Sequence, residues 1–396
     1  MARKLEIHPS EMENGGRLLM SKQIRILTHS FLDAYNNRLD RVFGGGLERY
    51  IVDLCHVITR MGLAPEVHQL GYKQSFSVEM DGIPVHGYSC EEQDRTNVFQ
   101  GMATGANAPV IYASFIWKPM QYRSDGLIIS HGINWDHPLD NVENKKMIGK
   151  AIQGALDQVR TVVSVDTHFL SFTRTVCNLK YPDQMEFLPN FVDTRHFHPI
   201  RKKNNENGRV RILFPRRISW ERGVIPMMVA VDDLLTNYPF LEVEFAGDFQ
   251  EGELVHRAFS RWFSVHPHQD RLRKMTYNFH DVAKAYQEAD IVVIPTIFSE
   301  GTSFSCLEAL STGKAIVASN VGGLNDLILQ GYNGYLVNPH ADEITDVLRF
   351  LVTDTEECKR LGKNARRTSL VFDRKRWMNK WEKILYRHFH NVGYTW

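Results

Sequence analysis

The chain has 396 residues, which is more than one ordinary hydrophobic core organises, so two domains are expected. It carries 47 basic and 46 acidic side chains, and the formal net charge of +1 gives no basis for broad nucleic-acid binding. The five cysteines are scattered and lack a C-x-x-C spacing, so neither a disulfide framework nor a zinc ribbon is expected, and a reducing, cytoplasmic compartment fits. No apolar run approaches the roughly 20 residues that cross a bilayer.

The first half alternates apolar strands with helical stretches. Residues 1–22 are polar, lack the apolar segment of a signal peptide and are expected to form an extension. Helices are expected over Leu47–Met61, from its apolar spacing, and near Glu143–Val159. Between these we expect a long loop at Ser30–Phe43 and strands at Ile24–Thr28, Glu66–Leu70, Ile83–Gly87, Pro109–Ser114, Leu127–His131 and Thr161–Val165. Strands separated by helices are typical of a parallel α/β sheet.

A polar, charged segment at residues 201–208 marks a linker between two domains. We therefore assign residues 23–200 to a first domain and residues 209–372 to a second. In the second domain, strands are expected at Val210–Phe214, Glu242–Asp248, Ile291–Ile294 and Ala315–Ala318. Residues 373–396 hold a last helix, Arg374–His390, that is rich in tryptophan and basic side chains.

The stretch Ser299–Gly313 (SEGTSFSCLEALSTG) combines a loop with the start of a helix. It follows a buried, parallel-type strand, and Thr302 or Ser303 can cap the helix whose apolar side starts at Phe304. Free N–H groups at Thr302–Phe304 would attract phosphate or another anion. Glu300 lies before this helix and Glu308 between one and two turns inside it, so two carboxylates can flank a ligand whose phosphate rests on the helix start. For an arbitrary pair of this spacing, two surface glutamates would be the plain alternative.

The pattern E-G-x-x-x-x-x-L-E-A, followed by GKAIVASNVGGL, resembles the E-x7-E signature of retaining glycosyltransferases with the GT-B fold, in family four (glycosyl transferases group 1). The resemblance extends from Ile24 to about His390. It implies an α/β fold of two Rossmann-like, doubly wound parallel-sheet domains that face a central cleft. It also implies transfer of a sugar from a nucleotide-diphosphate sugar, most often a UDP-sugar, to a hydroxyl of a glycan, a lipid-linked acceptor or a small molecule.

The resemblance gives the second-domain residues their roles. Glu308 would accept hydrogen bonds from ribose hydroxyls, and Glu300 would hold sugar hydroxyls and balance positive charge that develops at the anomeric carbon. PRRISWERG resembles the family's G-R-L-x-x-x-K-G, with Arg217 in the arginine place and Arg222 in the lysine place. Both would stabilise the departing diphosphate, together with the donor-binding residues Gly301, Thr302, Ser303 and Phe304. The family often reads E-G-F-G-L, so Ser303 puts a side chain beside the donor sugar and donor preference does not carry over.

Two features of the first domain are candidates for the same site. Gly44, Gly45 and Gly46 do not form a dinucleotide fingerprint, because Arg49 stands where the last glycine would be. Taken alone they read equally as a flexible loop; the resemblance brings Gly45 and Gly46 to the diphosphate and Gly44 to the acceptor. His131 ends a strand at the edge where α/β sheets bind ligands. A structural histidine is the alternative, whereas the resemblance implies a catalytic contact with the donor sugar and its phosphate on the acceptor side.

No metal or other cofactor is expected. The chain has no D-x-D motif, and the cationic partners at the PRRISWERG loop can replace a metal ion at the leaving diphosphate. The His-x-His pairs lack a further carboxylate or cysteine at ligand spacing, and they are His196/His198, His266/His268 and His388/His390. The partners expected are a nucleotide-sugar donor and a hydroxyl acceptor, with peripheral contact at a membrane left open. Rival functions are a GT-B sugar-nucleotide epimerase or phosphorylase, and a non-catalytic partner subunit that keeps the fold.

Overall fold

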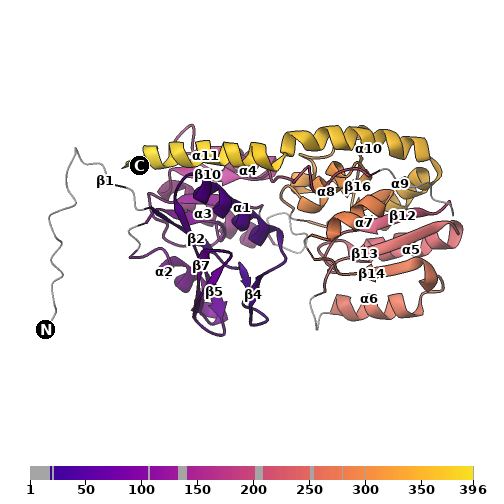
Figure 1. Ribbon diagram of the computed structural model, residues 1–396, viewed down its shortest axis with the longest axis horizontal. Helices are drawn as coiled ribbons and strands as arrows, with labels where there is room; N and C mark the ends of the chain where they lie inside the picture. Colours follow the sequence, from indigo (N-terminus) through magenta and orange to yellow (C-terminus); the bar gives the residue numbers. More distant parts are fainter. Residues whose placement is uncertain are drawn as a thin grey trace.

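The computed structural model describes residues 18–19, 22–105, 108–132, 141–200, 208–249, 254–278, 280–298 and 300–395. The expected extension at 1–22 and linker at 201–208 lie almost wholly outside these residues. Figure 1 shows two α/β units side by side, with the first half of the chain in one and most of the second half in the other. The expected two-domain architecture is confirmed.

The first domain is built on an eight-stranded sheet in the order β11-β10-β9-β8-β2-β5-β7-β6. Its strands are β2 (Gln23–Thr28), β5 (Ala64–Tyr72), β6 (Phe76–Met80), β7 (Ile83–Ser89), β8 (Val110–Tyr112), β9 (Leu127–Ser130), β10 (Thr161–Ser164) and β11 (Met185–Phe187). Neighbouring strands are parallel except for the hairpin β6–β7 at one edge. The short return at residues 81–82 explains the exception, because a tight turn can join only antiparallel strands.

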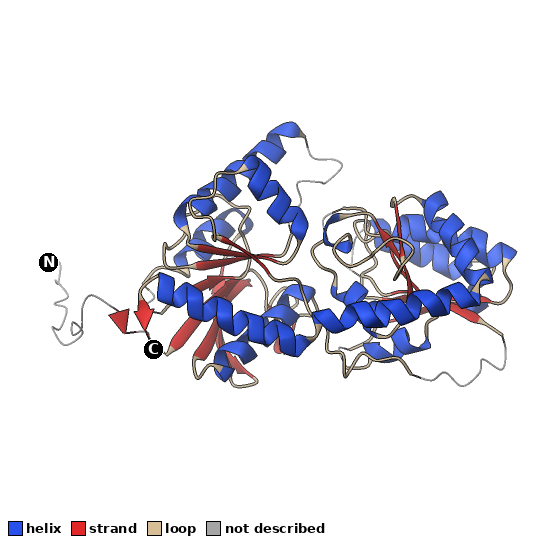
Figure 2. Cartoon of the chain, turned by 90° about the horizontal axis from the view of Figure 1, so that it is seen from above, coloured by secondary structure: helices blue, strands red, loops and turns tan. Residues whose placement is uncertain are grey.

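Helices cover both faces of this sheet (Figure 2). They are α1 (Gly46–Arg60), α2 (Arg95–Gly101), α3 (Val142–Gln158) and α4 (Thr167–Val176). The alternation of side chains along each strand feeds two cores: Ile26 of β2 packs in the cluster that contains α1, while Leu27 packs with α2 and α3. Such strands are apolar on both sides, which is why they read as continuous hydrophobic runs in the sequence.

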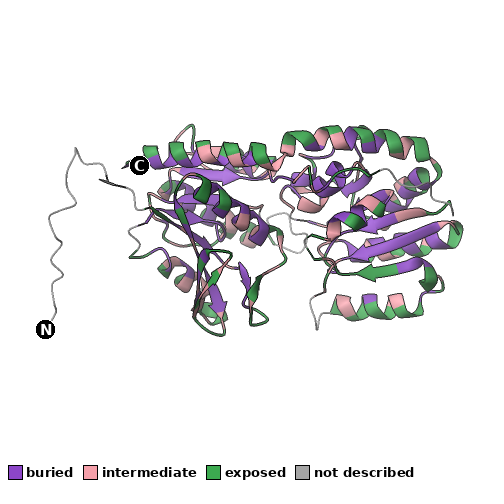
Figure 3. Cartoon of the chain, viewed as in Figure 1, coloured by how far each residue is buried: buried purple, intermediate pink, exposed green. Residues whose placement is uncertain are grey.

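The second domain has a six-stranded, fully parallel sheet in the order β14-β13-β12-β15-β16-β17. Its strands are β12 (Val210–Phe214), β13 (Leu241–Ala246), β14 (Leu272–Met275), β15 (Ile291–Ile294), β16 (Ala315–Ser319) and β17 (Tyr335–Val337). Its helices are α5 (Val224–Asn237), α6 (Leu254–Val265), α7 (Val282–Glu288), α8 (Phe304–Ser311), α9 (Ala341–Thr353) and α10 (Thr355–Ser369). Figure 3 shows the central strands buried between helices whose outer sides are exposed, whereas the edge strand β14 is largely exposed.

The last helix, α11 (Arg374–Asn391), leaves the second domain and lies along the first (Figure 1). It buries Trp377, Trp381 and Leu385 in the core that contains α1, and Trp381 Nε1 donates a hydrogen bond to Tyr50 Oη at 3.0 Å. At its end, β18 (Tyr394–Thr395) pairs in parallel with β1 (Leu18–Leu19). The segment expected as a loop at 30–43 contains an antiparallel hairpin of β3 (Leu32–Asp33) and β4 (Arg38–Val42).

Candidate active site between the two domains

The loop after β15 joins the two domains at the start of α8. Of the two capping residues considered, Ser303 caps the helix, since its Oγ accepts from the Cys306 N–H at 3.4 Å. Thr302 has another partner: its Oγ1 donates to the Val165 carbonyl at 2.8 Å and accepts from the Asn190 N–H at 2.7 Å. Both of those partners belong to the first domain, so Thr302 fixes the helix start against the domain that faces it.

Glu300 lies immediately before this helix start and is held by two arginines. Arg216 Nη2 donates to Glu300 Oε2 at 2.6 Å, and Arg222 forms an ion pair with the same oxygen. Arg216 also donates to Ser303 Oγ at 2.9 Å. Burial by itself would raise the pKa of Glu300, but the two guanidiniums outweigh it and hold the pKa below its ordinary value. Glu300 is therefore a fixed carboxylate in a buried, cationic setting.

The two adjacent arginines of the PRRISWERG loop are placed differently from one another. Arg217, the residue chosen from the sequence, is exposed, whereas Arg216 is buried and makes the Glu300 contact. Arg222 is 31% exposed at its side chain, so it faces solvent as well as Glu300. Apart from the family pattern, nothing in the sequence favours one arginine of the pair, because side-chain direction after a strand end depends on the loop.

Glu308 is buried inside α8 and has a partner from the other domain. Arg49 Nη1, from α1, forms a hydrogen-bonded ion pair with Glu308 Oε1. The Arg49 guanidinium also lies 4.7 Å from the centre of the Phe304 ring. In the sequence, Arg49 counts only against a glycine motif, and no pattern predicts this contact, which joins residues 259 positions apart.

The glycine loop brings α1 close to α8. A Cβ built on Gly45 would lie 2.2 Å from Glu48 Oε2, and one on Gly46 would lie 3.1 Å from Cδ2 of Phe304. Gly44 has open space around it, with no atom within 4 Å of such a Cβ. Gly45 and Gly46 thus permit close approaches, one within the first domain and one across the boundary.

His131 follows β9 and faces the loop of the second domain. Its ring meets Tyr50 edge-on with centroids 4.7 Å apart, and a Cβ on Gly301 would lie 2.8 Å from the His131 carbonyl oxygen. Burial, helped by the nearby His29, lowers the pKa of His131 to about 3, so the ring is neutral at physiological pH. Its Nε2 is buried and has no hydrogen-bond partner within the described part of the chain. The ring therefore offers one unused polar atom at the boundary.

Glu48, in the first turn of α1, is a second carboxyl group that the sequence did not single out. It is only 4% exposed. Burial raises its pKa to about 7, although the positive charge of Arg217 opposes the shift. The signal available was its position two residues after a glycine run, which is too weak to separate it from an exposed helix residue.

Two of the His-x-His pairs each include a histidine that makes an ordinary structural contact. His388 Nδ1 lies 3.0 Å from Thr161 Oγ1, and His266 Nε2 lies 3.0 Å from Asp232 Oδ1. Among the described residues, the one group whose ligand atoms lie close enough for a metal ion is Glu66, His68 and His86, in the first-domain sheet. None of the described helices has the length and apolar character that a bilayer-spanning segment requires.

Comparison with known proteins matches the second domain to a family. Residues 197–368 match the family described as "Glycosyl transferases group 1". The chain is 27% identical over 203 residues to "Sulfoquinovosyl transferase SQD2" of Arabidopsis thaliana, which covers 48% of this chain and 38% of that protein. It is 29% identical over 198 residues to "D-inositol 3-phosphate glycosyltransferase" of Paenarthrobacter aurescens (strain TC1), covering 46% of this chain and 47% of that protein. The matched region thus spans about half or less of these relatives.

Solved structures extend the likeness to both domains. Sucrose-phosphate synthase from Thermosynechococcus elongatus superimposes with a TM-score of 0.73 at 15% identity, over 93% of this chain and 99% of that one. WaaG, a glycosyltransferase involved in lipopolysaccharide biosynthesis, gives a TM-score of 0.71 at 13% identity, over 91% and 99%. At identities this low, the superpositions establish the fold alone. Residues 197–368 therefore match the glycosyl transferases group 1 family, within a chain that has the two-domain GT-B fold.

Proposed function

We propose that the protein is a retaining glycosyltransferase that moves a sugar from a nucleotide-diphosphate sugar, most reasonably a UDP-sugar, to an acceptor hydroxyl. The observation that carries the proposal is Glu300, held between Arg216 and Arg222 directly before the start of α8, where that loop meets the first domain. The family assignment supports sugar transfer. Support for the donor comes from Anabaena Alr3699/HepE, which shares the fold with a TM-score of 0.68 and was solved in complex with UDP-glucose.

The leaving diphosphate would rest on the start of α8. Two kinds of group can bind an anion there: the backbone N–H groups at Thr302–Phe304, which carry partial positive charge, and the guanidinium of Arg222. The exposed Arg217 on the same loop could add a further guanidinium. Each hydrogen bond to a charged oxygen contributes about 1.5–3 kcal/mol. Arginine binds phosphate oxygens in a bidentate manner and stays charged, so these groups can carry the charge of the departing diphosphate without a metal ion.

Glu300 would accept hydrogen bonds from sugar hydroxyls and balance the positive charge that develops at the anomeric carbon. Its depressed pKa keeps it ionised for this role. His131 would meet the sugar from the first domain through its unpaired Nε2, as a neutral hydrogen-bonding group and not as a cation. We assign no side chain as a nucleophile on the far face of the sugar. Retention would follow from front-face transfer, in which the leaving phosphate oxygen takes the proton of the acceptor.

Glu308 would bind the ribose hydroxyls of the nucleotide. One of its oxygens, Oε1, already accepts from Arg49. Ribose binding therefore uses the other oxygen or displaces Arg49. This makes the affinity for the nucleotide sensitive to a residue of the first domain, although the proposed nucleotide site belongs to the second.

The test is a screen of nucleotide sugars by thermal shift, followed by turnover of the donor that stabilises the protein. We expect one UDP-sugar to raise the melting temperature, Glu300→Gln and Arg222→Ala to abolish turnover, and EDTA to leave it unchanged. Arg349→Ala is the control, because Arg349 is a surface arginine paired with Asp233. The anomeric configuration of the product, read by NMR, checks retention. Turnover without an acceptor would point to an epimerase, a requirement for phosphate to a phosphorylase, and no stabilisation by any nucleotide sugar to a non-catalytic subunit.

A further inference from the structure

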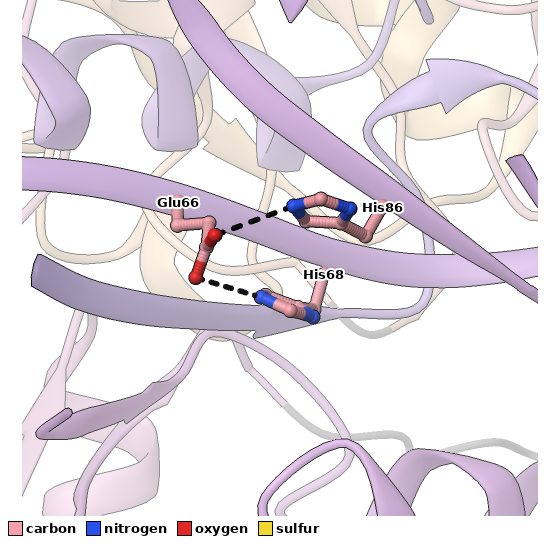
Figure 4. Close-up of side chains that lie close together, drawn as sticks. All are labelled: Glu66, His68 and His86. Atoms are coloured by element: carbon pink, nitrogen blue, oxygen red, sulfur yellow. Dashed lines mark hydrogen bonds and ion pairs between the residues drawn. The ribbon is translucent and has the colours of Figure 1, made fainter. Parts of the chain in front are cut away.

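Three potential metal ligands share one face of the first-domain sheet. Glu66 and His68 lie two residues apart on β5, so their side chains point to the same side. His86 lies on the neighbouring parallel strand β7, where it is the direct register partner of His68. Figure 4 shows the carboxylate of Glu66 with one oxygen toward each ring. The ligand atoms of the three residues all lie within 4.8 Å of one another.

The spacing of these atoms matches a small tetrahedral site. His68 Nε2 is 3.2 Å from Glu66 Oε2, and His86 Nε2 is 3.3 Å from Glu66 Oε1. In a tetrahedral zinc site with bonds of about 2.0–2.1 Å, neighbouring ligand atoms are roughly 3.3 Å apart. Because the two rings contact different oxygens of Glu66, side-chain rotation would have to bring one carboxylate oxygen and the two Nε2 atoms around a single ion.

The outer nitrogen of each ring has a hydroxyl partner. His68 Nδ1 lies 2.7 Å from Tyr88 Oη, and His86 Nδ1 lies 3.1 Å from Ser77 Oγ. Histidines that bind metals almost always donate their other N–H to an oxygen, which fixes the ring and leaves the ligating nitrogen with its lone pair. Both imidazoles already have that outer contact.

The surroundings favour zinc and leave room for a water ligand. The side chains of Glu66, His68 and His86 are 17%, 4% and 30% exposed, so solvent reaches the group from one side. Two imidazoles and one carboxylate are a common ligand set for zinc with one open position. Arg25 Nε lies 3.9 Å from Glu66 Oε2 and opposes a cation, but this arginine also donates to the Met102 carbonyl at 3.0 Å.

We propose that Glu66, His68 and His86 bind a Zn²⁺ ion that ties β5 to β7, away from the contact between the domains. Glu66 is near the beginning of β5, whereas the second domain is contacted beyond the carboxyl end of β9, where His131 lies against Gly301. The inference does not depend on the proposed sugar transfer. The expectation of no metal rested on motifs of close spacing, whereas His86 is 20 residues from Glu66.

The test uses the full chain, freed of metal with EDTA and then titrated with Zn²⁺, and with Co²⁺ as a spectroscopic probe. We expect one Zn²⁺ per chain, a higher melting temperature, and visible absorption from tetrahedral Co²⁺. His86→Gln keeps an amide donor near Glu66 but removes the imidazole, and it should weaken Zn²⁺ binding at least about tenfold and lose the thermal shift. His56→Gln is the matched control, because His56 lies 3.6 Å from one carboxylate, Asp53, and should bind Zn²⁺ as the wild type does.

Two results would overturn the proposal. One is equal Zn²⁺ uptake and equal thermal shift in the wild type and His86→Gln, which would place binding at other histidines. The other is a wild type that Zn²⁺ does not stabilise, which would leave the group as a hydrogen-bonded cluster only. If His86→Gln does not fold, Ser77→Ala replaces it: loss of the outer hydroxyl at His86 should weaken binding about tenfold, and unchanged binding would count against the site.

Discussion

Where the two domains meet, they treat buried titratable groups in opposite ways. On the second-domain side, Glu300 is buried as a carboxylate because Arg216 and Arg222 compensate its charge. On the first-domain side, burial pushes titratable groups toward their neutral forms: it lowers the pKa of His131 to about 3 and raises that of Glu48 to about 7. The second-domain side is charged and paired, whereas the first-domain side is polar and close to neutral apart from Arg49, which pairs with Glu308. The charged second-domain side is better suited than the first-domain side to bind a donor with a diphosphate leaving group.

The largest effect on stability and turnover is expected from removing the charge of Glu300 on the second-domain side. Glu300→Gln leaves the buried Arg216 without its counter-charge, which should lower the free energy of unfolding by about 3–5 kcal/mol and abolish donor turnover. Glu242→Gln is a matched control, because Glu242 is equally enclosed and pairs with Arg209 and Arg211 near the start of β13. It should lose stability but keep nucleotide-sugar binding. Denaturant unfolding and donor turnover measured on both variants separate the two effects.

The protonation of Glu48 on the first-domain side should make the free energy of unfolding depend on pH. Folding raises the pKa of Glu48 from an ordinary value near 4.5 to about 7. The contribution of Glu48 to the free energy of unfolding is therefore complete below its pKa in the unfolded chain, and it is lost as the pH rises through its pKa in the folded protein. Relative to Glu48→Gln, the wild type should therefore lose on the order of 3 kcal/mol of unfolding free energy between about pH 4.5 and 8. Urea unfolding across that range measures it. Parallel pH curves for the two proteins would show that Glu48 is not held neutral.

A smaller effect on stability is expected at the ion pair of Arg49 and Glu308, where the two domains are in contact. Arg49→Met removes the partner of Glu308, and the lost charged hydrogen bond should cost about 1.5–3 kcal/mol. A double-mutant cycle with Glu308→Gln measures this coupling directly. If Arg49 competes with ribose for Glu308, UDP should bind Arg49→Met no more weakly than it binds the wild type, whereas Glu308→Gln should weaken it. Weaker binding in both variants would mean that Arg49 contacts the nucleotide itself.

The smallest effect on stability and turnover is expected from the side chains that pack behind His131. Trp381→Phe removes the donor to the buried Tyr50 hydroxyl, and Tyr50 packs edge-on against His131. The expected cost is about 1 kcal/mol, with a modest loss of turnover because the His131 ring is less firmly placed. Trp262→Phe is the control, since Trp262 donates to Asp232 on the surface of the second domain. Equal turnover losses in both variants would argue against a role for this packing.

Much of the fold could be read from the sequence, because buried parallel strands are continuous apolar runs between helices. Ile291–Ile294 and Ala315–Ser319 were recognisable for that reason. The hairpin strand β6 was missed: its side chains alternate between half-buried and exposed, so it carries no apolar run. The hairpin in residues 30–43 was also missed, since its strands are short and one is mostly polar.

The site was readable only where its residues are neighbours in the sequence. Glu300 and Glu308 stand in one short motif, and the structure places both where two domains meet. Arg49 was not recognisable as a partner of Glu308, because a pairing over 259 positions depends on how the domains pack. Which of Arg216 and Arg217 contacts Glu300 was unpredictable for a similar reason: the loop after β12 decides which of two adjacent side chains turns inward.

The return of α11 to the first domain means that the two halves of this protein are not independent modules. A fragment ending at residue 372 would uncover the apolar surface on α1 that Trp377, Trp381 and Leu385 now fill, and it should aggregate or fold poorly. Exchange of the first domain between related proteins would therefore need to carry the final helix with it. The same helix adds a second covalent crossing beside the linker, so any opening of the cleft must bend the chain at two places together.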